Sequence, residues 1–206
     1  MSLHQLLHTI MRYGGSPVGF AKLARESGLA NNTVASGYIE QLSDLFAVLP
    51  SWPWDASKKN LQFRKPSKFH FLNLAVVVAF HPAALRHVHE WKQLSPNIKA
   101  MFLEWLVAQE VWRRSVLAQA ENPEAIGFWQ SKEHEIDFVT PQQELIEVKL
   151  GKTSPLDFGW FGKNFHKSKL TVINEISFQT QNIIGKTIEE FLLEAPTSLY
   201  YADEMR

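Results

Sequence analysis

The sequence has 206 residues, enough for one large domain or two small ones. Hydrophobic residues make up 45% of it, which allows a packed core and excludes wholesale disorder. Acidic and basic residues number 21 each, so no overall positive field attracts nucleic acid, and any DNA contact must come from a local basic patch. The absence of cysteine excludes disulfides, thiolate zinc sites and cysteine nucleophiles. The longest apolar run, Leu74–Phe80, is too short to cross a bilayer, and no signal peptide is visible, so we expect a cytoplasmic protein without a membrane partner.

Residues 4–48 predict three short helices in a helix-turn-helix arrangement. Ser16-Pro17 is expected to open the second helix, because serine is a good N-cap and proline suits the first turn. Gly28 is expected to end that helix, and Asn31 to cap the third. The third helix has an apolar stripe at helical spacing, which we expect to be buried: Val34, Tyr38, Ile39 and Leu42.

Two strands after these helices, at 45–49 and 69–72, would complete a winged helix. A winged helix that binds DNA inserts its third helix into the major groove and holds phosphates with basic residues. Against this interpretation, the third helix has no lysine or arginine and carries Glu40 and Asp44, and winged helices also serve as protein–protein modules. The residues expected to touch DNA are three polar residues of the third helix and five basic residues of the following loop: Asn32, Thr33, Ser36, Lys58, Lys59, Arg64, Lys65 and Lys68.

The strongest catalytic pattern lies on two apolar strands, 135–139 and 145–150. Because side chains alternate across a strand, an antiparallel pair would gather Asp137, Glu147 and Lys149 on one face. Adjacent carboxylates repel each other unless a cation lies between them, and such hard oxygen ligands suit Mg²⁺ or Mn²⁺. The lysine would then orient or deprotonate a metal-bound water, or stabilise the charge of the transition state. The alternative is an ordinary surface ion pair, which stabilises little.

The remaining elements predict a mixed α/β sandwich, because a helix, three strands, a helix and a further strand follow one another. Glu104 and Glu110 lie on the first of these helices, about 240° apart at roughly 100° per residue. We therefore do not expect both to face one metal. The expected elements are helix 98–120, strands 126–130, 135–139 and 145–150, helix 156–165, strand 170–173, a short strand near 182–184 and a final helix at 187–193.

This order and four short motifs resemble the PD-(D/E)XK nuclease superfamily. Leu103–Val111 resembles its Phe-Glu-x-x-Val-x-x-Glu-Leu helix, Glu135–Val139 its Glu-Val-Asp-Phe-Val strand, and Ile146–Lys149 its Ile-Glu-Val-Lys strand. Upstream, Arg64–Phe71 resembles a Lys-x-Pro-Lys-x-Tyr-Phe segment that joins a winged helix to the nuclease-like domain. The likeness is greatest to a domain of unknown function at the C-terminal end of prokaryotic AAA-type ATPases. It covers nearly the whole chain, although Asn73-Leu74-Ala75 stands where that family usually has Asp-x-Gly.

The resemblance implies an α+β fold, with a winged helix at 4–75 followed by a restriction-endonuclease-like sandwich at 96–195. It implies Asp137 and Glu147 as ligands of Mg²⁺ or Mn²⁺, Lys149 as the catalytic lysine and Glu104 as a helix acid that completes the site. The implied function is a nuclease-like, DNA-associated part of an ATPase with a metal-dependent phosphodiesterase site. The alternative is a catalytically inactive platform that binds DNA or protein and regulates the ATPase.

No ATPase motif is expected in this sequence. The run 180–187 ends like a phosphate-binding loop but has Thr180 where the first glycine belongs, so we interpret it as a chance match. The chain is therefore expected to be a fragment of such an ATPase, or a remnant that works without the motor.

Overall fold

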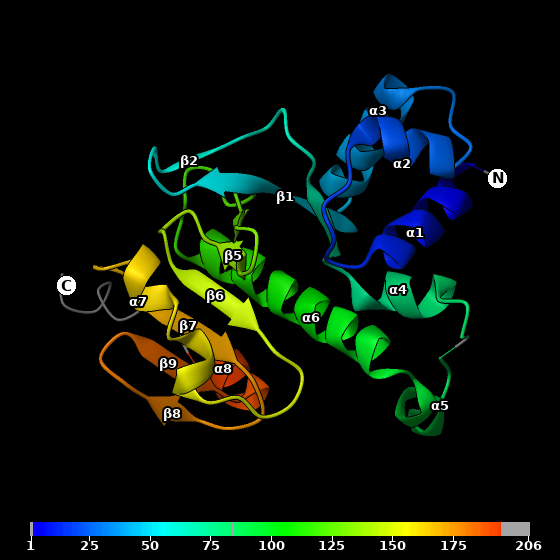
Figure 1. Cartoon of the computed structure of the whole chain (residues 1–206). Helices are drawn as coiled ribbons and strands as arrows, with labels where there is room; N and C mark the ends of the chain where they lie inside the picture. Colours follow the sequence, from blue (N-terminus) through cyan, green and yellow to red (C-terminus); the bar gives the residue numbers. More distant parts are fainter. Residues whose placement is uncertain (1, 84, 195–206) are drawn as a thin grey trace, which may run out of the picture. The chain divides into compact units, whose positions relative to one another are not determined.

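The computed structural model describes residues 2–83 and 85–194, which form two compact units (Figure 1). The boundary falls within the long helix α6 (Pro96–Leu117), where the first unit ends at Gln109 and the second begins at Glu110. Both units combine helices with β-strands that pair mostly antiparallel, so the predicted α+β class is confirmed. The finer domain bounds implied by the resemblance, 4–75 and 96–195, stay predictions, and residue 195 lies outside the described residues.

The helices of the first unit pack around one apolar core. Asn31 caps α3 as predicted, since its side chain accepts a hydrogen bond from Val34 N at 3.0 Å, and Gly28 follows α2 with a φ of +66°. Ile39 and Leu42 are buried as expected, whereas Val34, in the first turn of α3, is 37% exposed, so that part of the predicted stripe is wrong. The helices of this unit that precede α6 are α1 (Ser2–Tyr13), α2 (Phe20–Glu26), α3 (Asn32–Asp44), α4 (Leu74–Phe80) and α5 (Val88–Gln93).

The second helix begins later than the sequence predicts, at Phe20 and not at Ser16-Pro17. The reason is an isolated antiparallel bridge between Val18 and Ser67, in which Val18 N donates to Ser67 O at 2.9 Å. An extended backbone at Val18 cannot belong to a helix, so the long-range pairing outweighs the local N-cap signal.

The strand predicted at 45–49 also begins later, because β1 covers Val48–Asp55. The amides of Leu45, Phe46 and Ala47 still donate to carbonyls of α3, and Phe46 has a φ of 53°. These three residues therefore close the helix before the strand starts. In the first unit β1 pairs antiparallel with β2 (Asn60–Leu61) and with β3 (Lys68–Phe71).

The second unit is built on a six-stranded mixed sheet in the order β4-β5-β6-β7-β9-β8. β4, β5 and β6 pair antiparallel, β7 and β9 continue the sheet in parallel, and β8 closes it antiparallel. The two parallel pairings need crossover connections, and the segment with η1 and α7 makes the first of them, between β6 and β7. The bounds are β4 (Gly127–Gln130), β5 (Glu135–Val139), β6 (Leu145–Val148), η1 (Pro155–Phe158), α7 (Phe161–Asn164), β7 (Leu170–Ile173), β8 (Phe178–Gln179), β9 (Ile183–Lys186) and α8 (Ile188–Leu193).

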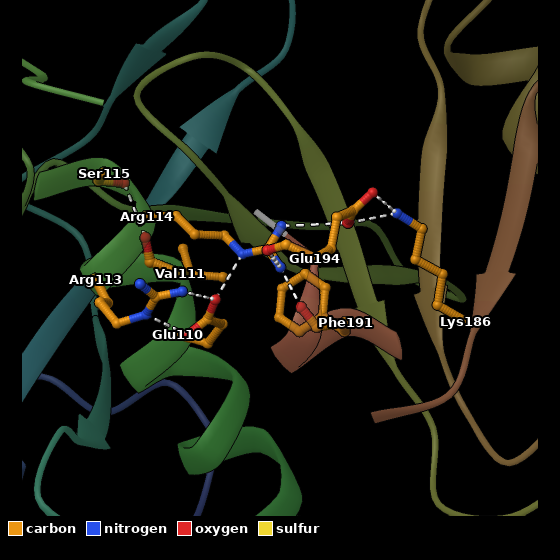
Figure 2. A network of polar contacts seen from close by, with 8 residues as sticks. All are labelled: Glu110, Val111, Arg113, Arg114, Ser115, Lys186, Phe191 and Glu194. Carbon is orange, nitrogen blue, oxygen red and sulfur yellow. Dashed lines mark hydrogen bonds and ion pairs between the residues drawn. The ribbon is translucent and has the colours of Figure 1, made fainter. Parts of the chain in front are cut away.

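A polar network joins α8 to the second-unit part of α6 (Figure 2). Arg114 donates to the buried carboxylate of Glu110 at 2.8 Å and to the carbonyl of Phe191, whose ring centroid lies 4.1 Å from the guanidinium carbon. Glu194 accepts from Arg114 and, at 2.6 Å, from the ammonium of Lys186 on β9. Arg114 therefore connects α6 to the end of α8, and Glu194 extends the network to β9.

Candidate active site

The β5–β6 hairpin sets the geometry of the predicted site. The strands pair antiparallel as expected, with Phe138 opposite Ile146 and Val139 opposite Leu145. Continuing this register by one pair brings Asp137 opposite Glu147, so the two acids come from neighbouring strands at the same level of the sheet.

Asp137, Glu147 and Lys149 lie together at this end of the hairpin. Val148 N donates to Asp137 Oδ2 at 2.9 Å, which fixes the first carboxylate. Lys149 Nζ lies 2.5 Å from Glu147 Oε1, and the side chain of Glu147 is 3% exposed, whereas that of Lys149 is 41% exposed. This ion pair is half-buried, and so it differs from the exposed surface pair that was the alternative interpretation.

The electrostatics of the site are dominated by buried negative charge. Burial raises the pKa of Glu147 well above its usual range, the Asp137 carboxylate raises it further, and Lys149 opposes the change. Burial alone would lower the pKa of Lys149, but the carboxylates of Glu147, Asp137 and Glu135 together outweigh it and the pKa of the ammonium is raised. Two carboxylates and one ammonium leave an excess negative charge, so a further cation would stabilise the ionised site.

The donor set fits a divalent cation. Within the described part of the chain, Glu147 Oε2 is buried and accepts no hydrogen bond, although it belongs to a carboxylate beside that of Asp137. Mg²⁺ is typically bound through one or two carboxylates and keeps several waters. Across residues 2–83 and 85–194, no group of three or more His, Asp or Glu side chains is arranged to hold a metal ion.

A pocket of about 450 Å³ opens beside the acid pair, within the second unit. Glu147 and Lys149 line one part of it, and the rings of His134 and Trp160 line another. Pockets of roughly 300–1,000 Å³ are the usual size for small ligands and cofactors. The pocket therefore joins the carboxylate–lysine site to an aromatic wall.

Two residues of this site were missed by sequence reasoning: Glu135 and His134. Glu135 lies two residues before Asp137 on β5, and its carboxylate acts on the pKa values of both Glu147 and Lys149. Strand alternation would have found Glu135, since it shares the face of Asp137. No local signal predicts that His134 meets Trp160, because the two residues lie in separate segments of the chain.

Glu104, the predicted helix acid, belongs to the first unit and has a polar environment there. Its Oε1 lies 3.4 Å from Nδ1 of His70 and 4.0 Å from Nζ of Lys68. His70 Nε2 lies 3.0 Å from Ser51 Oγ, and burial with the nearby Lys68 lowers the pKa of His70 to about 3. The ring is therefore neutral, with one nitrogen facing a hydroxyl and the other a carboxylate. That Glu104 completes the metal site stays a prediction.

The eight residues predicted to contact DNA all lie in the first unit, and seven of them are exposed while Lys68 is buried. Lys68 is 1% exposed and lies beside Glu104, whereas DNA phosphates are reached by exposed cations. The burial of Lys68 departs from our expectation for the basic loop. The other seven residues are exposed: Asn32, Thr33 and Ser36 on α3, and Lys58, Lys59, Arg64 and Lys65 around β2.

Comparison with protein-family models, with curated proteins and with solved structures finds no match to this chain. The likeness to the PD-(D/E)XK superfamily therefore stays a resemblance of short sequence motifs and of their order. Among the described residues, no helix has both the length and the apolar character that a membrane span requires.

Proposed function

We propose that the second unit is a nuclease-like domain in which Asp137 and Glu147 hold Mg²⁺ or Mn²⁺ for phosphodiester cleavage in DNA. The observation that carries this proposal is the Glu147 carboxylate. It is buried beside a second carboxylate, it pairs with Lys149 through Oε1 at 2.5 Å, and its Oε2 accepts no hydrogen bond from the described residues. An orphaned, buried carboxylate oxygen is costly in a structural ion pair, and a bound cation removes that cost.

Each residue has a role that follows from its position. Asp137, fixed by Val148 N, and Glu147 would supply the anionic oxygens that bind the cation. When bound, the cation would polarise a phosphate oxygen and make a coordinated water more acidic. Lys149 lines the pocket, and its ammonium is placed to donate a hydrogen bond to a phosphate oxygen or to the attacking water.

The same proposal assigns the first unit a DNA-guiding role as a winged helix, and the second unit a restriction-endonuclease-like sandwich. Three helices followed by antiparallel strands, with exposed Lys58, Lys59, Arg64 and Lys65 around β2, support the first part. The mixed sheet that carries the hairpin of Asp137 and Glu147 supports the second. Association with an AAA-type ATPase is inferred from the motif resemblance alone.

Metal-dependent cleavage of DNA tests the proposal. Supercoiled plasmid and branched DNA should be nicked by the wild type in Mg²⁺ or Mn²⁺, and Lys149→Ala should lose at least about a hundredfold in rate, as expected for removal of a charged transition-state donor. Glu133→Gln is the matched control, because Glu133 lines the same pocket but is exposed. Cleavage that is absent from the wild type, or equal in Lys149→Ala, would refute the enzymatic role.

A second candidate function is an inactive platform that binds DNA or protein for an ATPase. The acidic character of α3 favours it: Glu40 and Asp44 are exposed on the presumed recognition helix, and that helix contains no lysine or arginine. A protein partner with a basic surface would suit such a helix better than a phosphate backbone. Binding of DNA or protein without any binding of Mg²⁺ or Mn²⁺ would favour the platform.

A further inference from the structure

Two aromatic residues that line the pocket, His134 and Trp160, belong to a stack of rings. The ring centroids of His134 and Trp160 lie 4.5 Å apart with an interplanar angle of 5°. Trp129 lies 5.7 Å from Trp160 at 11°, and Phe165 meets Trp129 edge-on at 5.0 Å. His134 and Trp160 line the pocket, whereas Trp129 and Phe165 support the stack.

The two rings that line the pocket are held in place by their own segments. Trp160 lies between Phe158 and Phe161, whose side chains are buried, and Phe161 contacts the Trp160 ring edge-on at 6.0 Å. The turn that carries His134 is closed by Ser131, whose amide donates to His134 O at 2.7 Å and whose Oγ accepts from His134 N at 2.9 Å. The stack is thus ordered before any ligand binds, which lowers the entropic cost of stacking on it.

The charges around the pocket decide which part of a nucleotide fits against this wall. Four carboxylates and two ammonium groups line it, so its interior repels a phosphate but not an uncharged ring. A phosphate is instead favoured at Lys149 and at the cation of the proposed metal site. The charged residues that line the pocket are Glu133, Glu135, Glu147 and Asp157, with Lys132 and Lys149.

We propose that this pocket binds one unpaired nucleobase by stacking on the outer face of the His134–Trp160 stack, and that the substrate is DNA with a single-stranded segment or end. This inference rests on the proposed function, since it places the phosphate of the same nucleotide at Glu147 and Lys149. A volume of about 450 Å³ has room for a nucleoside. Bases within a duplex already stack on their neighbours, so only an unpaired base presents its face to such a wall.

The test is the affinity of the full chain for a short labelled oligonucleotide of mixed, non-self-complementary sequence and for its blunt duplex. Anisotropy is measured in Ca²⁺, which shares the oxygen-ligand preference of Mg²⁺. The wild type should prefer the single strand, Trp160→Ala should weaken that binding about tenfold, and Trp160→Phe should restore most of it. His134→Ala provides a second variant in case Trp160→Ala does not fold. Trp91→Ala is the control, since Trp91 is a partly exposed tryptophan of α5, which belongs to the first unit and does not line the pocket.

The outcomes separate this inference from the proposed function. Equal affinity for single strand and duplex, or wild-type affinity in both His134→Ala and Trp160→Ala, overturns the stacking site even if metal-dependent cleavage is present. A single-strand preference that is lost in Trp160→Ala supports the stacking site even if no DNA is cleaved. A single-strand preference without any cleavage of DNA would refute the proposed cleavage but not the stacking site.

Discussion

Removal of Arg114 should destabilise the second unit far more than removal of its neighbour Arg113. Both arginines donate to the buried Glu110, but Arg113 is 44% exposed and gives this carboxylate two hydrogen bonds of 2.6 and 2.7 Å. Arg114 is 16% exposed and also holds the carbonyl of Phe191, the carboxylate of Glu194 and the Phe191 ring (Figure 2). The two variants therefore share one partner and differ in the connection to α8.

The expected magnitudes follow from these contacts. A hydrogen bond between charged groups contributes about 1.5–3 kcal/mol and a partly buried cation–π contact about 1 kcal/mol. Arg114→Met leaves Glu110 paired with Arg113, so we expect a loss of about 3 kcal/mol in the free energy of unfolding. Arg113→Met should cost about 1 kcal/mol or less, because its side chain is largely solvated.

Urea denaturation of the full chain, followed by circular dichroism, measures the free energy of unfolding of both variants, and the m-value should be unchanged. Amide hydrogen exchange adds a local measurement: exchange in α8 should accelerate in Arg114→Met and stay unchanged in Arg113→Met. Equal destabilisation by the two substitutions, or unchanged protection of α8 in Arg114→Met, would refute the role assigned to Arg114.

Four further variants test other parts of the structure. The pKa of His70 is about 3 in the folded state and about 6.5 in the unfolded state, so between about pH 3 and about pH 6.5 only the unfolded state binds this proton. The free energy of unfolding should therefore rise by roughly 2 kcal/mol from about pH 5 to about pH 8. His70→Gln should remove that rise. Gly37→Ala should stabilise α3 by about 1 kcal/mol, since among the described residues no atom beyond the neighbouring residues and the backbone of α3 lies within 4 Å of the added methyl. Gly185→Ala should destabilise by about 2 kcal/mol, because its methyl would meet the Phe178 ring. Asn31→Ala should cost about 1 kcal/mol in thermal or urea unfolding, since it removes the cap on Val34 N, and a loss near zero would contradict the capping role.

Local sequence patterns predicted the elements whose signal is short-range. The strand 135–139 and the strand 170–173 have the predicted bounds, and the short connection of residues 140–144 fits the antiparallel pairing of the hairpin. The starts of α2 and β1 were predicted too early, because a long-range strand pairing in one case and the last turn of a helix in the other set the backbone conformation. Val18 pairs with Ser67, and Phe46 closes α3.

The site was predictable only in part for the same reason. Alternation brings Asp137, Glu147 and Lys149 together, but it says nothing of burial, and the depth of Glu147 comes from packing around the hairpin. The stack of Trp160 on His134 depends on how the segment after β6 folds back on the β4–β5 turn, which no local pattern contains. Lys68 was likewise predicted to be an exposed basic residue, because it follows a basic loop, and it is buried in the structure.

Binding of Mn²⁺ to the wild-type chain, measured by calorimetry or by electron paramagnetic resonance, tests the central claim most directly. The carboxylates of Asp137 and Glu147 should bind one ion per chain, and both Asp137→Asn and Glu147→Gln should weaken the binding at least tenfold, while Glu133→Gln leaves it unchanged. A wild type that binds no Mn²⁺ or Mg²⁺, or variants at Asp137 and Glu147 that bind it as well as the wild type does, would contradict the account.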